Sequence, residues 1–149
     1  TRTMMAGLLF RPQPARIGQA AIRRPGRDVT LVTYGATLWT ALKAAETAEA
    51  EGISVEILDL RSVQPWDEAA VLASLSKTHR LLIVHEAVEA FGVGAEIAAR
   101  MADIGFDELD APILRVAAPF SPVPFSTVLE NEWRVSEPKI LAALRRLMA

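Results

Sequence analysis

The sequence alternates short apolar runs with longer stretches of helical periodicity, and this alternation limits the folds that it can adopt. We expect strands at residues 17–23, 29–34, 53–58, 81–84 and 113–117. We expect helices at residues 37–51, 67–77, 95–102 and 136–148. This order favours a mainly parallel sheet with helices on both of its faces. The sequence therefore predicts an α/β domain over residues 17–149.

Several local signals support these boundaries. The run from Leu81 to Val84 is wholly apolar, which is typical of a central strand that is covered on both faces. Gly52 follows the helix at 37–51, where a C-terminal cap belongs. Ser136 is expected to cap the last and most clearly amphipathic helix, with Pro138 in its first turn.

The first sixteen residues lack a clean period. Pro12 and Pro14 oppose a helix there, so we interpret residues 1–16 as a linker or arm from an upstream domain. The apolar cluster Leu8–Phe10 is expected to pack on a partner or on the domain itself. Because the chain starts at Thr1 and not at a methionine, we expect a fragment or a processed chain.

Composition excludes several classes of function. Apolar residues make up 51% of the chain and charged residues 23%, which is typical of a globular protein. The net charge of −2 and the lack of a basic stripe argue against a nucleic-acid partner. No apolar run approaches the ~20 residues that span a bilayer. The chain contains no cysteine, which is compatible with the cytoplasmic location that we expect.

Two sequence features could carry chemistry near the expected sheet. His85 and Glu86 end the strand 81–84, where they could shuttle protons or serve a structural or interface role. Gly92-Val93-Gly94 precedes a helix and could bind an anion, although a lone G-x-G is a weak signal and close packing at a helix start is the favoured explanation. Two histidines without ligand spacing do not predict a zinc site.

Two further segments are candidates for interaction surfaces. The acidic cluster of Asp103, Asp107, Glu108 and Asp110 fits a solvated helix end or a docking surface for a basic partner. Aromatic residues and prolines crowd residues 119–125, and this segment either covers one end of the sheet or forms an interface. Phe120 and Phe125 are its interface candidates.

Several blocks, taken in order, resemble the transketolase C-terminal domain family. They are residues 28–35 (DVTLVTYG) and 57–67 (ILDLRSVQPWD). Residues 85–87 with 91–97 (HEA and FGVGAEI) and 109–116 (LDAPILRV) are similar to the β subunits of 2-oxo acid dehydrogenases, such as the pyruvate and branched-chain enzymes. The likeness covers roughly residues 17–149, and residues 1–18 and 131–135 depart from the family pattern.

The resemblance implies a three-layer α/β/α fold with a mostly parallel five-stranded sheet, in which the first strand is antiparallel. It implies a whole enzyme that decarboxylates a 2-oxo acid on thiamine diphosphate and magnesium and passes the acyl group to lipoyl groups. Those cofactors are held by an upstream domain and by the α subunit. We therefore expect no catalytic, cofactor-binding or metal-binding residue in this chain, and no catalysis by the domain alone.

The same resemblance implies partners. The domain is expected to contact the α subunit and a second β subunit in an α2β2 assembly, and to dock the subunit-binding domain of the lipoyl acyltransferase. An acidic position matching Asp110 and the terminal carboxylate on Ala149 are the implied docking groups. Asp107, His85, Glu86 and the two phenylalanines above complete the set of interface candidates.

Two alternatives remain open at this point. The first is the equivalent domain of a transketolase or a deoxyxylulose-phosphate synthase, against which residues 85–87 and 109–112 argue. The second is a free-standing module that binds a small ligand near His85 and the Gly92–Gly94 turn.

Overall fold

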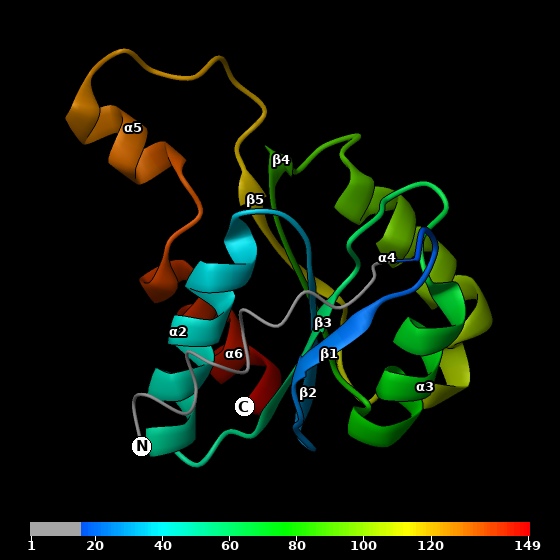
Figure 1. Ribbon diagram of the computed structural model, residues 1–149. Coiled ribbons are helices and arrows are strands. Elements are labelled where there is room, and N and C mark those ends of the chain that lie inside the picture. The colour runs from blue at the N-terminus through cyan, green and yellow to red at the C-terminus, as the bar shows by residue number, and fades with distance from the viewer. Residues whose placement is uncertain (1–15) are drawn as a thin grey trace.

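Five strands form one mixed sheet at the centre of the computed structural model, which describes residues 16–149 (Figure 1). The strands are β1 (Ala21–Arg24), β2 (Val29–Thr33), β3 (Val55–Asp59), β4 (Leu81–Val88) and β5 (Leu114–Ala118). Their order is β1-β3-β2-β4-β5. Strand β1 is antiparallel to β3, and the other pairs are parallel.

Helices cover both faces of this sheet. They are α2 (Thr37–Ala50), α3 (Glu68–Thr78), α4 (Val93–Ile104), α5 (Thr127–Trp133) and α6 (Glu137–Met148), with a short 3₁₀ turn η1 (Phe106–Glu108). Helices α2 and α6 pack on one face, and α3 and α4 on the other (Figure 1). The predicted three-layer α/β/α fold is therefore confirmed, including the antiparallel first strand.

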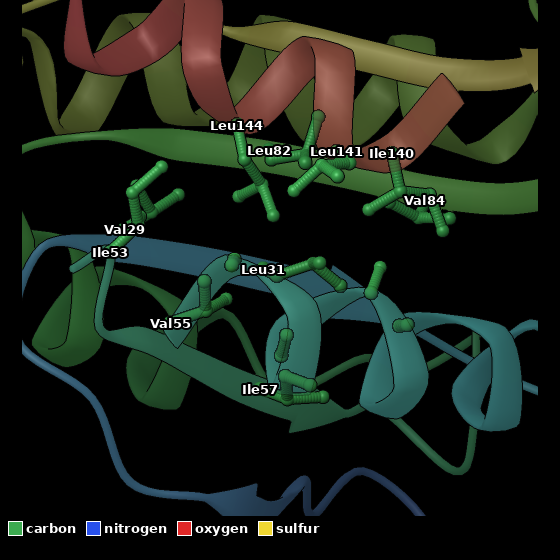
Figure 2. Close-up of a cluster of buried hydrophobic side chains, with 14 of the residues drawn as sticks. Val29, Leu31, Ile53, Val55, Ile57, Leu82, Val84, Ile140, Leu141 and Leu144 are labelled. Carbon is green, nitrogen blue, oxygen red and sulfur yellow. The ribbon is translucent and has the colours of Figure 1, made fainter. Parts of the chain in front are cut away.

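Alternation along the strands divides the apolar core into two clusters. Figure 2 shows the cluster under α2 and α6, where Leu31, Val55 and Leu82 meet Leu141 and Leu144. The neighbouring strand residues point to the second cluster, under α3 and α4. Every side chain from Leu81 to Val84 is at most 1% exposed, so the predicted two-sided burial of this strand is confirmed.

Helix ends follow the expected local signals with one exception. The amides of Gly52 and Ile53 donate to the carbonyls of Glu49 and Ala48, which is the hydrogen-bond pattern of a glycine C-cap. The Asp67 carboxylate caps α3 by accepting from the Ala70 amide. Ser136 does occupy the N-cap position of α6, but its side chain makes no capping hydrogen bond.

Several predicted boundaries were wrong by one or more residues, including the start of β3, which is at Val55 and not at residue 53. Strand β1 begins at Ala21 because residues 17 and 18 form a turn, which leaves Ile17 79% exposed. Strand β4 continues beyond Val84 to Val88, because its backbone keeps pairing with β5 although Glu86 points to solvent. Helix α4 begins at Val93, two residues before the expected start.

Helix α5 replaces part of an expected loop. Its seven residues have no buried member, so periodicity of apolar residues could not reveal it. The loop before it and α5 itself project from the rest of the domain (Figure 1). The expected linker at residues 1–16 and the Leu8–Phe10 cluster lie outside the described residues except for Arg16.

Candidate interaction surfaces at the two ends of the sheet

His85 lies inside β4 and is fully buried, with 0% of its surface exposed. Its Nε2 atom accepts a hydrogen bond of 3.1 Å from the amide of Gly94, at the start of α4. The Tyr34 ring stacks on the imidazole with centroids 6.0 Å apart and an interplanar angle of 13°. Among the described residues, the buried Nδ1 atom has no hydrogen-bond partner. The imidazole is therefore a structural element that positions the start of α4.

Both glycines of the Gly92-Val93-Gly94 turn lie too close to β4 to carry a side chain. A Cβ atom on Gly94 would lie 2.2 Å from His85 Nε2, and one on Gly92 would lie 2.0 Å from the Val88 carbonyl oxygen. Both distances are shorter than real carbon contacts allow. The structure thus supports the interpretation of Gly92-Val93-Gly94 as a close-packing motif, because the Gly94 amide is already engaged and cannot hold an anion.

Burial lowers the pKa of His85 below its ordinary value of about 6.5. The backbone of Ala87 opposes this shift, the Arg115 charge adds to it, and the Glu89 charge opposes it. The neutral ring accepts from Gly94, so protonation of Nε2 would remove that hydrogen bond. A proton-shuttle role is not supported by this burial.

Glu86, the next residue, has an exposed side chain. Burial raises the pKa of the Tyr34 hydroxyl, and the negative charge of Glu86 raises it further. Glu86 therefore places a negative charge near the carboxyl end of β4, whereas the preceding residue, His85, is buried.

A broad apolar surface lies at this carboxyl end of the sheet. We call it the carboxyl-end surface, and its exposed large side chains are Phe91, Phe120, Val123, Phe125, Val128 and Leu129. Phe91 and Phe120 meet edge to face with ring centroids 6.1 Å apart. The indole of Trp133 donates a 3.1 Å hydrogen bond to the Ser121 hydroxyl, which links α5 back to the preceding loop. Such a concentration of exposed aromatic area makes this surface a candidate interaction site.

A different surface lies at the amino end of β4. His79 and Arg80, just before this strand, hold two distant parts of the chain together. The Asp110 amide donates to the His79 carbonyl at 2.9 Å, and Arg80 Nε donates to the carbonyl of Leu147 at 2.9 Å. These contacts bring Asp110 to the same end of the domain as the C-terminal residues of α6.

This amino-end surface comprises Asp107, Asp110 and Ala149, which lie at the same end of the domain, and a cavity that borders Asp110. The cavity has a volume of about 570 Å³ and is lined mainly by apolar side chains, including Phe106, Leu109 and Ile113, together with Asp110. Phe106 is 71% exposed at its rim. An apolar hollow with a carboxylate at its edge suits a partner that presents an apolar side chain beside a basic one.

The predicted interface residues therefore form two groups at opposite ends of the sheet. His85, Glu86, Phe120 and Phe125 belong to the carboxyl end, where only His85 is inaccessible. The remaining candidates belong to the amino end. Within residues 16–149, no three acidic or histidine side chains lie close enough together to hold a metal ion.

Sequence reasoning missed a buried polar network under α3. Glu56 is 2% exposed, and its carboxylate accepts hydrogen bonds from Lys77, from the Ser74 hydroxyl and from the Gly26 amide. Burial alone would raise the pKa of Glu56, but these hydrogen bonds lower it on balance. The only signal in the sequence is a charged residue inside an apolar strand. Because every carboxylate oxygen has a donor, the network is a stabilising feature.

Comparison with known proteins places this geometry in a family. Residues 18–140 match the model of the transketolase C-terminal domain. The chain is 47% identical, over 89% of its length, to the β subunit of acetoin:2,6-dichlorophenolindophenol oxidoreductase of Bacillus subtilis, of which it covers 39%. It is 46% identical, over 84% of its length, to the β subunit of the pyruvate dehydrogenase E1 component of Staphylococcus epidermidis, of which it covers 38%. The chain thus spans about two fifths of these curated relatives.

Solved structures show the same fold. A split-gene transketolase, described as an inactive β4 tetramer, aligns with a TM-score of 0.79 at 24% identity, covering 91% of this chain and 43% of that one. A transketolase from Campylobacter jejuni aligns with a TM-score of 0.58 at 12% identity, covering 87% of this chain and 19% of that one.

The described helices all fall short of the length and apolar character that a membrane crossing requires. The family match covers most of the chain, and the relatives with high identity are dehydrogenase β subunits. The chain therefore belongs to the transketolase C-terminal domain family, and it is of the type found in the β subunits of pyruvate and acetoin dehydrogenases.

Proposed function

We propose that this chain is the assembly and docking domain of the β subunit of a cytoplasmic, thiamine-diphosphate-dependent 2-oxo acid dehydrogenase. The whole enzyme would decarboxylate a 2-oxo acid and pass the acyl group to lipoyl groups. The observation that carries the proposal is the separation of two exposed, chemically distinct surfaces on a domain whose His85 is buried inside β4.

We propose that magnesium and the diphosphate are held outside this chain. Two observations support this: the described residues contain no group of three metal-ligating side chains, and the amide of Gly94 is already bonded to His85. Thiamine diphosphate would supply the carbanion chemistry of decarboxylation from elsewhere in the enzyme. This domain would instead hold subunits in place, and we expect the isolated chain to turn over no substrate.

The carboxyl-end surface is proposed to contact the α subunit of an α2β2 assembly. Subunits that stay associated bury large, apolar interfaces, and exposed phenylalanines supply much of the binding free energy in such contacts. Phe125 is fully exposed and Phe120 is 70% exposed. A second β subunit is the other partner that an α2β2 arrangement brings to the domain.

The amino-end surface is proposed to dock the subunit-binding domain of the lipoyl acyltransferase. Asp110 offers negative charge at the edge of an apolar hollow, and Asp107 is close to it in the sequence. Complementary charge speeds association and selects a basic partner without requiring a large apolar interface. This arrangement suits a contact that forms independently of subunit assembly.

Two phenylalanines of almost equal exposure allow a matched test. Phe120 is 70% exposed at the carboxyl end, and Phe106 is 71% exposed at the amino end. The β subunit carrying Phe120→Ser should bind its α subunit about 30-fold more weakly, by roughly 2 kcal/mol, as measured by calorimetric titration. The control Phe106→Ser should bind the α subunit normally and bind the acyltransferase domain more weakly.

The opposite pattern of binding, or unchanged binding by both variants, would refute the assignment of the two surfaces. Circular dichroism would first establish that both variants remain folded, which exposed positions favour.

A further inference from the structure

Residues 59–67, which run from Asp59 at the end of β3 through the loop that precedes α3, are the most recognisable block of the sequence and have no role in the surfaces described above. It contains Asp59, Arg61, Ser62 and Asp67, whose polar side chains all face another part of the chain, namely the segment Gly18–Arg24 that leads into and forms β1. The contacts between the two segments join residues more than thirty-five positions apart.

Side chains of this loop satisfy four backbone atoms of the incoming segment. The Gly18 amide donates to the Ser62 hydroxyl at 2.8 Å, and the Ala20 amide donates to the Asp67 carboxylate at 2.8 Å. The guanidinium of Arg61 donates to the carbonyls of Gln19 and Ala20, at 3.0 and 3.1 Å.

Within β1 itself, the Asp59 carboxylate accepts two hydrogen bonds from the Arg23 guanidinium, of 3.0 and 2.8 Å. The same carboxylate accepts from the Arg61 amide at 3.1 Å, which holds Arg61 at a φ of 58°. A non-glycine residue in this left-handed region is strained and persists where the surroundings require it. The hydrogen bond between Asp59 and the Arg61 amide therefore keeps Arg61 in the backbone conformation from which its side chain reaches the incoming segment.

These contacts compensate for a weak strand. Strand β1 has four residues, lies at the edge of the sheet and pairs only with β3, with an irregular register. Residues 18–20 precede the strand and have no strand partner, so their path depends on the loop side chains. Gly18 is also confined, because its φ is 78° and a Cβ atom there would lie 3.3 Å from Cγ of Pro65.

We propose that residues 59–67 form a clasp that fixes the direction from which the preceding polypeptide enters this domain. The clasp acts on the backbone of residues 18–20 and not on a partner protein, so it is independent of the two surfaces proposed for assembly and docking. Its consequence is that a domain attached before Gly18 is oriented by Arg61, Ser62 and Asp67.

Amide hydrogen exchange of this chain tests the clasp. Ser62→Ala removes the acceptor of the Gly18 amide, and Arg61→Ala removes two donors to the segment. Ser62→Ala should accelerate exchange at Gly18 about tenfold, the effect of one lost hydrogen bond. Arg61→Ala should accelerate exchange at both Gly18 and Ala20, because the segment loses the two carbonyl contacts that hold it against the loop. Exchange in the central strand β2 should remain unchanged.

The chain offers matched controls for both variants. Ser136→Ala removes a hydroxyl that makes no capping hydrogen bond, and Arg145→Ala removes a guanidinium with two hydrogen bonds to Glu51 on the other face. Neither control should affect Gly18 or Ala20. Unchanged exchange at both amides in the clasp variants would overturn the proposal. Equal acceleration of the β2 amides would also overturn it, because the loop would then contribute only to global stability.

Discussion

The two ends of the sheet share one core and differ in surface chemistry. The carboxyl end exposes Phe91, Phe120 and Phe125 around a projecting loop and helix. The amino end exposes carboxylates around a hollow. Apolar surface of the first kind is suited to lasting burial, whereas charge beside a hollow is suited to selective, salt-dependent docking. This difference is the basis for proposing a separate partner for each end of the scaffold.

The prediction with the largest expected effect concerns the close contact between Gly94 at the start of α4 and His85 in β4. Gly94→Ala would place a Cβ atom 2.2 Å from His85 Nε2, so His85 or the start of α4 must move. We expect a loss of about 3 kcal/mol or more in the free energy of unfolding, measured by urea denaturation. Gly35→Ala is the control: nothing lies within 4 Å of its added Cβ, and only its φ of 65° opposes the change. A smaller loss for Gly94→Ala than for Gly35→Ala would contradict the close contact.

A second prediction compares two helix N-caps, one with a side-chain hydrogen bond and one without. Asp67 caps α3 and also holds the Ala20 amide, whereas Ser136 caps α6 without a side-chain hydrogen bond. Asp67→Ala should therefore cost about 2 kcal/mol in unfolding free energy, and Ser136→Ala less than about 0.5 kcal/mol. Thermal unfolding of both variants provides the measurement, and equal losses would argue against the difference in capping.

The third prediction concerns charge at the amino end. Asp110→Asn keeps the side-chain volume and removes one negative charge beside the cavity. Binding of the acyltransferase domain should weaken about tenfold at low salt, mainly through slower association, and the difference should shrink as salt is added. Glu86→Gln makes the same change at the other end and should leave this binding unaltered. Surface plasmon resonance at two salt concentrations would show an equal effect of both variants if the ends were not distinct.

The smallest expected effect is a pH dependence located at His85. Because burial lowers the pKa of His85 in the folded state, the unfolded chain binds its proton more readily. This contribution to stability is complete above the unfolded pKa of about 6.5 and is lost as pH falls below it toward the folded value. Urea denaturation at pH 7.5 and 5.5 should show lower stability at pH 5.5. His85→Gln should have a smaller pH difference, and an unchanged difference would exclude His85 as its source.

The sequence predicts what depends on local pattern. Apolar runs located all five strands and, with helical periodicity, four helices, because these patterns reflect which side chains face the core. Gly52 marked the end of α2, and Ser136 marked the start of α6. The antiparallel direction of β1 came only from the family resemblance, since a run of apolar residues carries no direction.

What the sequence could not predict depends on long-range contacts. Helix α5 buries no side chain and leaves no periodic signal. The imidazole of His85 meets an amide nine residues later, and Arg61 meets carbonyls more than forty residues earlier. The grouping of interface candidates into two ends likewise required the strand directions. Sequence thus identified most of the residues concerned, and the fold was needed to assign their neighbours.

The adjacent residues His79 and Arg80 have a consequence for variation within the family. One bonds to the segment that carries Asp110 and the other to the last turn of α6, so both move with the start of β4. Because the Asp110 amide bonds to the backbone carbonyl of His79, that contact persists through a substitution of His79, whereas a substitution of Arg80 removes its bond to the last turn of α6. Changes at the exposed Phe120 or Phe125 disturb neither contact, so the aromatic surface can vary without moving the segments joined at the amino end.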